Sequence, residues 1–329
     1  MLDIPNARSS HTIPTPRGGG VAFVISFMLS ALFLQQTGLM SAGVCVVYVL
    51  GGGGIALLGF RDDRRPVRTL VKLCIHLVVS AAAIWGLWHD HGLSEGWGWI
   101  GNAGAFALGT LALAWGINLY NFMDGIDGLA VSEAVFLSLG GALVIMLGGG
   151  SAQEALLLAA ACMGFGVFNW PPARLFMGDA GSGFLGFVLT VIAIESIGRM
   201  ETSIWSWLIL AGVFIVDATF TLLRRMLGGQ RWYEAHRSHA YQNAAMRWGS
   251  HRRVTVTVLW INYFWLLPWA LASHFWPTMA GVFCALALLP LVAIAVFFKA
   301  GQALPSGPRT DTLPQQSTEM RGRLLGSGH

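Results

Sequence analysis

The chain has 329 residues, of which 55% are hydrophobic and only 11% are charged, and its formal net charge is +4. Because a soluble domain carries about 25% charged residues, this composition excludes an ordinary soluble protein. The apolar runs are about 18–22 residues long, which suits helices that cross a hydrocarbon core about 30 Å thick. We therefore expect an all-α polytopic membrane protein.

Ten apolar segments follow a polar stretch at residues 1–19. In chain order, we expect membrane-crossing helices at about residues 20–38, 41–60, 69–88, 102–119, 129–148, 152–168, 181–198, 204–223, 254–272 and 277–298. Residues 1–299 would then form one integral membrane domain. Residues 300–329 are rich in Pro, Gln, Ser and Gly, a composition typical of a disordered cytoplasmic tail.

The distribution of positive charge predicts how the chain is oriented. If residues 1–19 are cytoplasmic, alternation places the loops on that same side at 61–68, 118–128, 169–180, 224–253 and 299–329. Of the 20 Lys and Arg residues, only Arg199 then falls on the outer side, in agreement with the positive-inside rule. Four unusual polar clusters share the cytoplasmic side, where they could form one active site. A transporter needs a site reachable from both sides and is therefore disfavoured.

The four cysteines lie inside apolar runs: Cys45, Cys74, Cys162 and Cys284. Their spacing matches no metal-binding motif. We therefore expect small buried hydrophobic side chains and no disulfides.

The first polar cluster reads RDDRRPVR at residues 61–68. Adjacent acids cannot share one face of a regular helix, but at a helix end Asp62 and Asp63 can diverge, one toward a metal ion and one toward a substrate. Five neighbouring bases would attract phosphate: Arg61, Arg64, Arg65, Arg68 and Lys72. The alternative is a charged flank that only anchors the helices.

The second cluster reads NLYNFMDGIDGLA at residues 118–130. Asn118, Asn121, Asp124 and Asp127 are spaced by three, which puts neighbours on roughly one side of a helical turn. Two acids where apolar segments end indicate that something cationic or polar meets them. The alternative is a capped turn between two helices. A calcium loop fits poorly, because Val135 stands where such a loop needs Glu.

The third cluster reads NWPPARLFMGDAGSGFLG at residues 169–186. Asp179 comes just before a new helix, and the N-terminus of a helix binds phosphate through its free amides. Asp179 could supply an oxygen ligand for magnesium, and Phe176 could stack on a base. The alternative is that Asp179 or Ser182 caps the helix.

The fourth cluster contains RWYEAHRSHAYQ in the loop at residues 224–253. His236 and His239, with Arg237 between them, could bind zinc, but the loop offers no convincing third ligand, so phosphate binding suits them better. Just upstream, Asp217 lies inside an apolar segment. A buried lone acid is costly, so we expect a partner for it such as an arginine or a metal.

Several carboxylates and several Arg and His residues therefore share one membrane face. Magnesium takes one or two carboxylates plus substrate phosphates. The combination indicates phosphoryl-group chemistry on a lipid substrate, driven by positioning and electrostatic stabilisation.

The motifs occur in the order DIPNARSSHTIPTPRGGG, GFRDD, NLYNFMDGIDGLA, NWPPARLFMGDAGS and HRSHAYQ. With these motifs the chain resembles the polyprenyl-phosphate N-acetylhexosamine-1-phosphate transferases, glycosyltransferase family 4, from about Asp3 to Arg253. The resemblance implies that HexNAc-1-phosphate passes from a UDP-sugar to undecaprenyl phosphate, with Mg²⁺ or alternatively Mn²⁺, and that UMP is released. PTPRGGG and HRSHAYQ look most like the branch that initiates O-antigen synthesis, a step of lipopolysaccharide biosynthesis.

The resemblance also implies roles for the acids. Asp62 and Asp63 would lie near the lipid phosphate, and one of them would deprotonate it. Asp179 would be the principal magnesium ligand, with Asp124 as a second one. Asn118 and Asn121 would line the same diphosphate and metal region.

Further implied roles concern the substrates. The residues that would hold uracil are Asp127, Asn169 and Phe176. Those that would contact the diphosphate or sugar of the donor are His236, Arg237 and His239. Further assignments to the site go to Arg8 and His11 in the first loop and to Lys72 in the helix after the Asp pair.

The resemblance implies a protein of the bacterial inner membrane, with membrane lipid around it, no nucleic acid partner and assembly as a homodimer. Family members have a helix before the loop with which this sequence begins. His-Arg-Ser-His replaces the consecutive histidines of the peptidoglycan branch, so UDP-MurNAc-pentapeptide is not the expected donor. The competing interpretations are UDP-GlcNAc transfer for another envelope polymer, a phosphotransferase that uses CDP-alcohols, and a transporter of lipid or nucleotide sugar.

Overall fold

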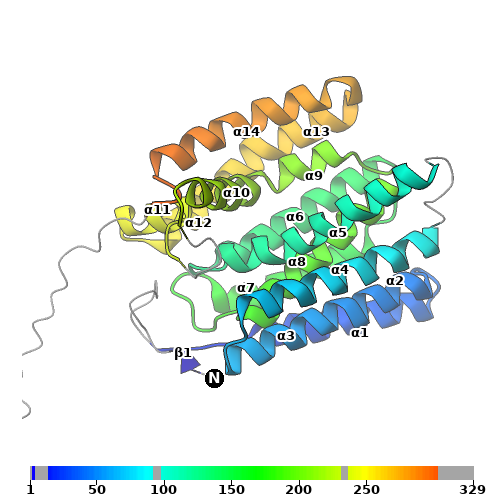
Figure 1. The fold of residues 1–329 in the computed structure, drawn as a ribbon, viewed down its shortest axis with the longest axis horizontal. Coiled ribbons are helices and arrows are strands. Elements are labelled where there is room, and N and C mark those ends of the chain that lie inside the picture. Colours follow the sequence, from blue (N-terminus) through cyan, green and yellow to red (C-terminus); the bar gives the residue numbers. More distant parts are fainter. Residues whose placement is uncertain (1, 4–13, 92–97, 231–235, 303–329) are drawn as a thin grey trace, which may run out of the picture.

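The computed structural model describes residues 2–3, 14–91, 98–230 and 236–302. The described chain is a bundle of helices (Figure 1) with one antiparallel pair of two-residue strands, β1 (Leu2–Asp3) and β2 (Thr15–Pro16). The prediction of an all-α polytopic membrane protein is confirmed. Residues Arg8 and His11 and most of the predicted tail at 300–329 lie outside the described residues.

The helices follow one another in this order: α1 (Gly20–Gln36), α2 (Ala42–Val46), the π-helix η1 (Val47–Gly52), α3 (Gly53–Arg64), α4 (Thr69–His91), α5 (Gly98–Met123), α6 (Leu129–Leu147), α7 (Gln153–Asn169), α8 (Asp179–Gly198), α9 (Ile204–Leu210), α10 (Gly212–Leu227), α11 (Ala240–Trp248), α12 (His251–Ile261), the π-helix η2 (Asn262–Leu266), α13 (Leu267–Phe275), the 3₁₀ helix η3 (Pro277–Met279) and α14 (Ala280–Phe297). Each of the ten predicted segments is helical.

The number of membrane crossings differs from the prediction. Within the described residues, seven helical segments are long and apolar enough to cross a membrane, or eight if the bent pair α9 and α10 counts as one crossing. Helices α1 and α7 are apolar but have only 17 residues each. The predicted number of ten is therefore not confirmed.

Helix α8 lies inside the bundle and packs against α3 and α5. Small residues allow this close approach, as is common between membrane helices. A Cβ atom added to Gly186 of α8 would collide with the backbone of Gly116 in α5. In the same way, a Cβ atom on Gly59 of α3 would collide with the backbone of Asp179. The C-terminal half of α3 therefore lies directly on the start of α8.

Two expectations about the helices and one about a cysteine were wrong. The segment at 204–223 is not one helix, because α9 and α10 meet at an angle of 79°. The predicted loop at 224–253 contains a further helix, α11, which begins just after His239. Cys45, Cys162 and Cys284 are buried as expected, but Cys74 is exposed on α4, and all four are free thiols.

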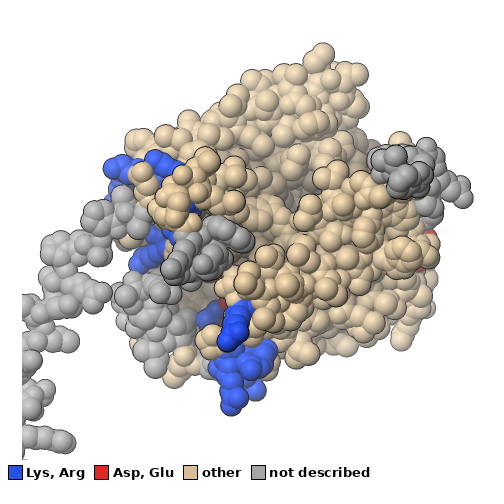
Figure 2. All heavy atoms as spheres, in the orientation of Figure 1, with Lys and Arg blue, Asp and Glu red and all other residues tan. Residues whose placement is uncertain are grey.

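The ends of the helices bring the four polar clusters together. Direct contacts join the end of α3 to the start of α8, α5 to α8, and α10 to α11. Figure 2 shows, on the visible face, Lys and Arg atoms gathered near this end of the bundle. That this end faces the cytoplasm stays a prediction.

Candidate active site

Arg17 joins two of the predicted acids. The segment that carries it runs beside the segment that precedes α8: the backbone N–H of Phe176 donates to the Pro16 carbonyl (2.8 Å), and that of Gly18 donates to the Phe176 carbonyl (3.1 Å). From this position Arg17 Nε lies 2.9 Å from Asp63 Oδ1, and Arg17 Nη2 lies 2.6 Å from Asp179 Oδ1. A guanidinium has its donors in a fixed fork, so it can hold both carboxylates in one geometry.

Asp63 caps helix α8. Its carboxylate accepts hydrogen bonds from the backbone N–H groups of Asp179 (3.0 Å) and Ala180 (3.3 Å). These amides are among those that a helix start leaves unpaired. The side chain of Asp63 is 0% exposed. Asp63 therefore stabilises the start of α8 through these buried hydrogen bonds. Its predicted contact with the lipid phosphate stays a prediction, and neither Asp179 nor Ser182 makes the cap that was the alternative.

Asp62 points in a different direction, as expected for adjacent acids at a helix end. Asp62 Oδ2 lies 2.6 Å from Lys72 Nζ, and Asp62 Oδ1 accepts a hydrogen bond from the Val67 N–H (2.6 Å). Lys72 Nζ is also 3.7 Å from Asp179 Oδ2. Lys72 therefore lies between Asp62 and the metal ligand predicted at Asp179.

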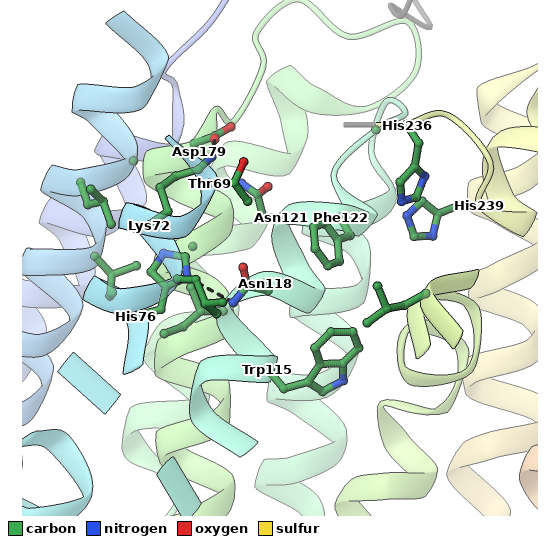
Figure 3. Close-up of a pocket in the computed structure, with 18 of the residues that line it drawn as sticks. Thr69, Lys72, His76, Trp115, Asn118, Asn121, Phe122, Asp179, His236 and His239 are labelled. Carbon is green, nitrogen blue, oxygen red and sulfur yellow. Dashed lines mark hydrogen bonds and ion pairs between the residues drawn. The ribbon is translucent and has the colours of Figure 1, made fainter. Parts of the chain in front are cut away.

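A cavity of about 490 Å³ opens beside these groups (Figure 3). The predicted site residues that line it are Lys72, Asn118, Asn121, Asp179, His236 and His239. They come from helices α4, α5 and α8 and from the segment before α11. Asn121 Nδ2 donates to Ser182 Oγ (3.3 Å), which ties α5 to α8 at the level of Asp179. Apolar side chains, among them Leu58 and Trp115, line other parts of the cavity.

Asp124 is an acid near Asp179 whose charge lacks a direct partner in the described part of the chain. Among the described residues, no hydrogen bond or ion pair reaches its carboxylate. Burial, offset in part by the nearby Arg17 and reinforced by the carboxylates of Asp179 and Asp63, raises the pKa of Asp124 to about 8. Such a group is stabilised in its charged form by a bound cation.

A divalent cation would balance the excess negative charge of this region. Four acids (Asp62, Asp63, Asp124 and Asp179) face two bases (Arg17 and Lys72), which leaves two negative charges when all are ionised. No group of three or more His, Cys, Asp or Glu residues in the described part of the chain is arranged to hold a metal. Magnesium does not need one, because it takes one or two carboxylates plus substrate phosphates and water. The residues therefore fit a magnesium ion whose coordination shell is completed by substrate phosphates and water.

The residues from Asn118 to Asp127 were expected to lie on one side of a helical turn. The structure does not show this arrangement. Helix α5 ends at Met123, and Gly128 has a left-handed φ of 74° that turns the chain into α6. Asp127 consequently faces away from the main cavity. Its carboxylate accepts from the Ala173 N–H (3.1 Å) and lies 3.2 Å from His251 Nδ1.

Asp127 lines a second hollow of about 540 Å³, together with Arg237 and His251. Arg237 is thus separated from its neighbours His236 and His239, which line the main cavity. The structure does not bring Asp127 and Arg237 to the same cavity as Asp179. Their predicted contacts with the donor stay predictions.

Asn169 supports two loops. Its Oδ1 accepts from the Gly128 N–H (3.1 Å) and its Nδ2 donates to the Leu175 carbonyl (2.9 Å). The side chain is buried, so it holds the loop before α6 against the loop before α8. Phe176 is half-buried, and its backbone pairs with the segment around Arg17. The uracil contacts predicted for Asn169 and Phe176 stay predictions.

The partner of Asp217 is neither an arginine nor a metal, in contrast to the expectation. Asp217 accepts hydrogen bonds from the N–H groups of Ala240 and Tyr241, both at 2.9 Å, at the start of α11. It also lies 3.2 Å from His239 Nδ1. A helix start compensates negative charge through its free amides. Asp217 therefore fixes both α11 and the imidazole of His239.

The two histidines stack on one another with ring centroids 5.0 Å apart. His239 also stacks on Phe122 of α5, at 6.2 Å. Burial, together with the neighbouring His239 and Arg225, lowers the pKa of His236 to about 3. Without a bound substrate, His236 is therefore neutral at neutral pH and offers a neutral donor or acceptor.

Two side chains in this site were not predicted from the sequence. Arg17 belongs to PTPRGGG, where a lone Arg before three glycines was the available signal. His76 lines the cavity and lies four residues after Lys72, so it falls on the same side of α4. A polar residue inside an apolar helix was the signal there.

These observations define a polytopic membrane protein whose acids, bases and histidines surround a cavity at one end of the helices. Comparison with known proteins agrees with this class. Residues 44–197 match the family described as glycosyl transferase family 4. The chain is 30% identical over 272 residues to the probable undecaprenyl-phosphate N-acetylglucosaminyl 1-phosphate transferase of Bacillus subtilis (strain 168), covering 79% of this chain and 74% of that protein.

Two further relatives have different acceptors or donors in their names. The decaprenyl-phosphate N-acetylglucosaminephosphotransferase of Mycolicibacterium smegmatis is 28% identical, with 78% of this chain and 72% of that protein covered. The phospho-N-acetylmuramoyl-pentapeptide-transferase of Moorella thermoacetica is 31% identical, with 64% and 69% covered. The chain belongs to glycosyl transferase family 4, which confirms the resemblance drawn from its motifs.

Proposed function

We propose that this protein transfers HexNAc-1-phosphate from a UDP-sugar to undecaprenyl phosphate and releases UMP. The relatives support the general reaction, because their names describe transfer of a phospho-sugar to a polyprenyl phosphate. The observation that carries the proposal is the cavity that joins Lys72 and Asp179 to His236 and His239. It combines an acid that could hold a cation (Asp179), Lys72 and two histidines that could bind phosphate, and an apolar wall in one space.

The reaction forms one P–O bond and breaks another. A phosphate oxygen of the lipid attacks the phosphorus that carries the sugar, and the bond from that phosphorus to the oxygen of UMP breaks. Both reactants are negatively charged, so the protein has to reduce their repulsion and hold them in line. Lys72, which lines the cavity and pairs with Asp62, and Arg17, which pairs with Asp179, supply positive charge for this purpose.

Asp62 is the better placed of the two adjacent acids to act as the base. Its side chain retains some exposure and lies beside Lys72, whereas the Asp63 side chain is 0% exposed. A base has to come within hydrogen-bond reach of the proton that it accepts. We therefore assign deprotonation of the lipid phosphate to Asp62 and support of α8 to Asp63.

Magnesium, or manganese in its place, would be held by Asp179 and Asp124. When bound, the ion neutralises charge on the diphosphate and makes the phosphorus easier to attack. Asn121 and Ser182, which hydrogen-bond to each other beside Asp179, would orient the phosphates in the same region.

The proposed pathway rests on the motifs of the first loop and of the histidine-containing segment. PTPRGGG and HRSHAYQ favour initiation of O-antigen or a related surface polysaccharide in the bacterial inner membrane. The names of two relatives suggest an alternative, in which the donor is UDP-GlcNAc and the product serves another envelope polymer. Assembly as a homodimer is part of the same proposal.

The test is an assay of UMP release in membranes or detergent. We expect UMP from at least one UDP-HexNAc, and only when undecaprenyl phosphate and Mg²⁺ are both present. A panel of UDP-HexNAc donors would identify the sugar. If no donor released UMP under these conditions, the proposed reaction would be wrong.

A further inference from the structure

A polar pair lies on the wall of the cavity below the ionic groups. His76 of α4 and Asn118 of α5 lie side by side in hydrogen-bond contact, and both line the cavity (Figure 3). The side chain of His76 is largely buried at 8% exposure. A buried polar group inside an apolar helix is costly unless its hydrogen bonds are satisfied. The hydrogen bonds of this pair therefore indicate what it is built to bind.

The contacts of Asn118 fix the tautomer of His76. Asn118 Nδ2 lies 2.7 Å from the Ala114 carbonyl oxygen. Because a carbonyl oxygen can only accept, the amide must present its nitrogen there, which fixes its orientation. The same Nδ2 lies 3.2 Å from His76 Nδ1. His76 Nδ1 must then accept, and the proton of the neutral imidazole is on Nε2.

One donor and one acceptor remain for a ligand. Among the described residues, no hydrogen bond reaches His76 Nε2 or Asn118 Oδ1. Neither atom is among the fully buried polar atoms that lack a partner, so both remain accessible. The pair therefore offers an N–H donor held in one orientation, with an amide oxygen beside it.

The place of the pair along the helix indicates which substrate it meets. His76 comes one turn after Lys72 on the same face of α4, so it lies deeper in the bundle than the Lys72–Asp62 ion pair. Apolar side chains of Leu73 and Trp115 line the same part of the cavity. A ligand here meets ionic groups on one side and apolar groups on the other, as the phosphate of a prenyl phosphate would at the start of its chain.

We propose that His76 is a binding residue for the lipid acceptor, donating from Nε2–H to an oxygen of its phosphate while Asn118 fixes the imidazole. This inference rests on the proposed function for the identity of the acceptor. A neutral donor suits the place, because a further cation beside Lys72 would compete for Asp62. The hydrogen bond selects a phosphorylated prenyl chain over the free alcohol and places the nucleophilic phosphate next to Asp62.

The first test measures the two substrates separately. In H76L, the KM for undecaprenyl phosphate should rise roughly tenfold or more, the size of a lost hydrogen bond to a charged group, while the KM for the UDP-sugar stays unchanged. H76Q offers a neutral N–H donor and should recover most of the loss. H89L, on the exposed far part of the same helix, is the matched control. Equal changes in both KM values, or no change in H76L, would overturn the inference.

The second test does not depend on turnover. Undecaprenyl phosphate, added without donor, should raise the unfolding temperature of the wild type and H76Q but not of H76L, and undecaprenol should have no such effect. If the wild type released no UMP but kept this His76-dependent shift, the proposed reaction would fail and the binding inference would stand. An equal shift in H76L, or an equal effect of undecaprenol, would overturn it.

Discussion

Arg17 Nη2 lies 2.6 Å from Asp179 Oδ1, and Nε of the same guanidinium lies 2.9 Å from Asp63 Oδ1. One side chain from the first loop therefore joins the end of α3 to the start of α8. Lys72 approaches Asp179 from the other side. The carboxylate that we assign to magnesium is held between two cations from different parts of the chain.

The first prediction concerns this double contact. R17K should lower UMP release roughly 10- to 100-fold, the range for a lost hydrogen bond to a charged group, because a single ammonium cannot hold two carboxylates in the geometry of a guanidinium. R174K, at an exposed arginine of the neighbouring loop, is the control and should leave the rate of UMP release unchanged. Full activity in R17K would show that the positive charge alone suffices.

The second prediction separates the adjacent acids. D62N should lower turnover about 100-fold or more, the larger loss seen for a single electrostatic group, with little change in unfolding temperature. D63N should lower both turnover and unfolding temperature, because its carboxylate caps α8 and pairs with Arg17. Rates and thermal unfolding in detergent measure the two effects. If D63N unfolded like the wild type, its capping role would be refuted.

The third prediction concerns the metal. EDTA should abolish UMP release, and Mg²⁺ or Mn²⁺ should restore it, because the two anionic reactants otherwise repel each other. D179N should lower turnover about 100-fold or more and should raise the Mg²⁺ concentration needed for half-maximal rate. D124N should raise that concentration as well. Activity that survives chelation would count against any role for the ion.

The meeting of the four clusters could be predicted from the sequence, but their internal geometry could not. Hydrophobic runs and the asymmetry of Lys and Arg place the loops on one side, because burial and membrane topology depend on composition and segment length. The acids of 61–68 and the start of α8 consequently meet as expected. No local pattern shows that Arg17 reaches them, because its position depends on backbone pairing with Phe176, far along the chain.

Asp127 shows why regular spacing was misleading. Its separation of three from Asp124 suggests a shared helix face only if the helix continues, and α5 ends at Met123. After that point the direction of each side chain depends on the turn at Gly128 and on the partners His251 and Ala173. Asp217 was recognised as an acid that needs compensation. That compensation comes from α11, whose start lies inside what was read as a loop.

The fourth prediction is a pH dependence of stability. Burial lowers the pKa of His236 to about 3 in the folded protein, against an ordinary value of about 6.5 in the unfolded chain. Between these values the unfolded state binds a proton that the folded state does not. This histidine therefore costs no stability above about pH 6.5 and destabilises the fold increasingly as the pH falls toward 3.

H236Q should remove that part of the acid sensitivity. Between pH 7.5 and 5 its unfolding temperature should fall less than that of the wild type, by roughly 2 °C or more. H89Q, at an exposed histidine, is the control and should behave like the wild type. Parallel curves for H236Q and the wild type would mean that His236 takes up its proton in the folded state.

The fifth prediction concerns a pair away from the active site. Glu133 of α6 and Asn262 of η2 are both buried, and Asn262 Nδ2 donates to Glu133 Oε2 at 2.6 Å. Within the described part of the chain, Glu133 Oε1 and Asn262 Oδ1 are buried and have no hydrogen-bond partner. An ionised carboxylate with one hydrogen bond is costly inside a membrane helix, whereas a protonated one can donate from Oε1 to Oδ1 and satisfy both atoms.

Glutamine has the same donor and acceptor as a protonated glutamate. E133Q should therefore keep the unfolding temperature of the wild type in detergent. E133A should lower it by several degrees, because it leaves both polar groups of Asn262 unpaired at a cost of about 1–3 kcal/mol each, before any cost of the cavity. N262L should also lower the unfolding temperature, because it removes the hydrogen-bond partner of the buried Glu133. A loss in E133Q as large as in E133A would show that the charge of Glu133 stabilises the fold, and a cation near it would then have to be sought.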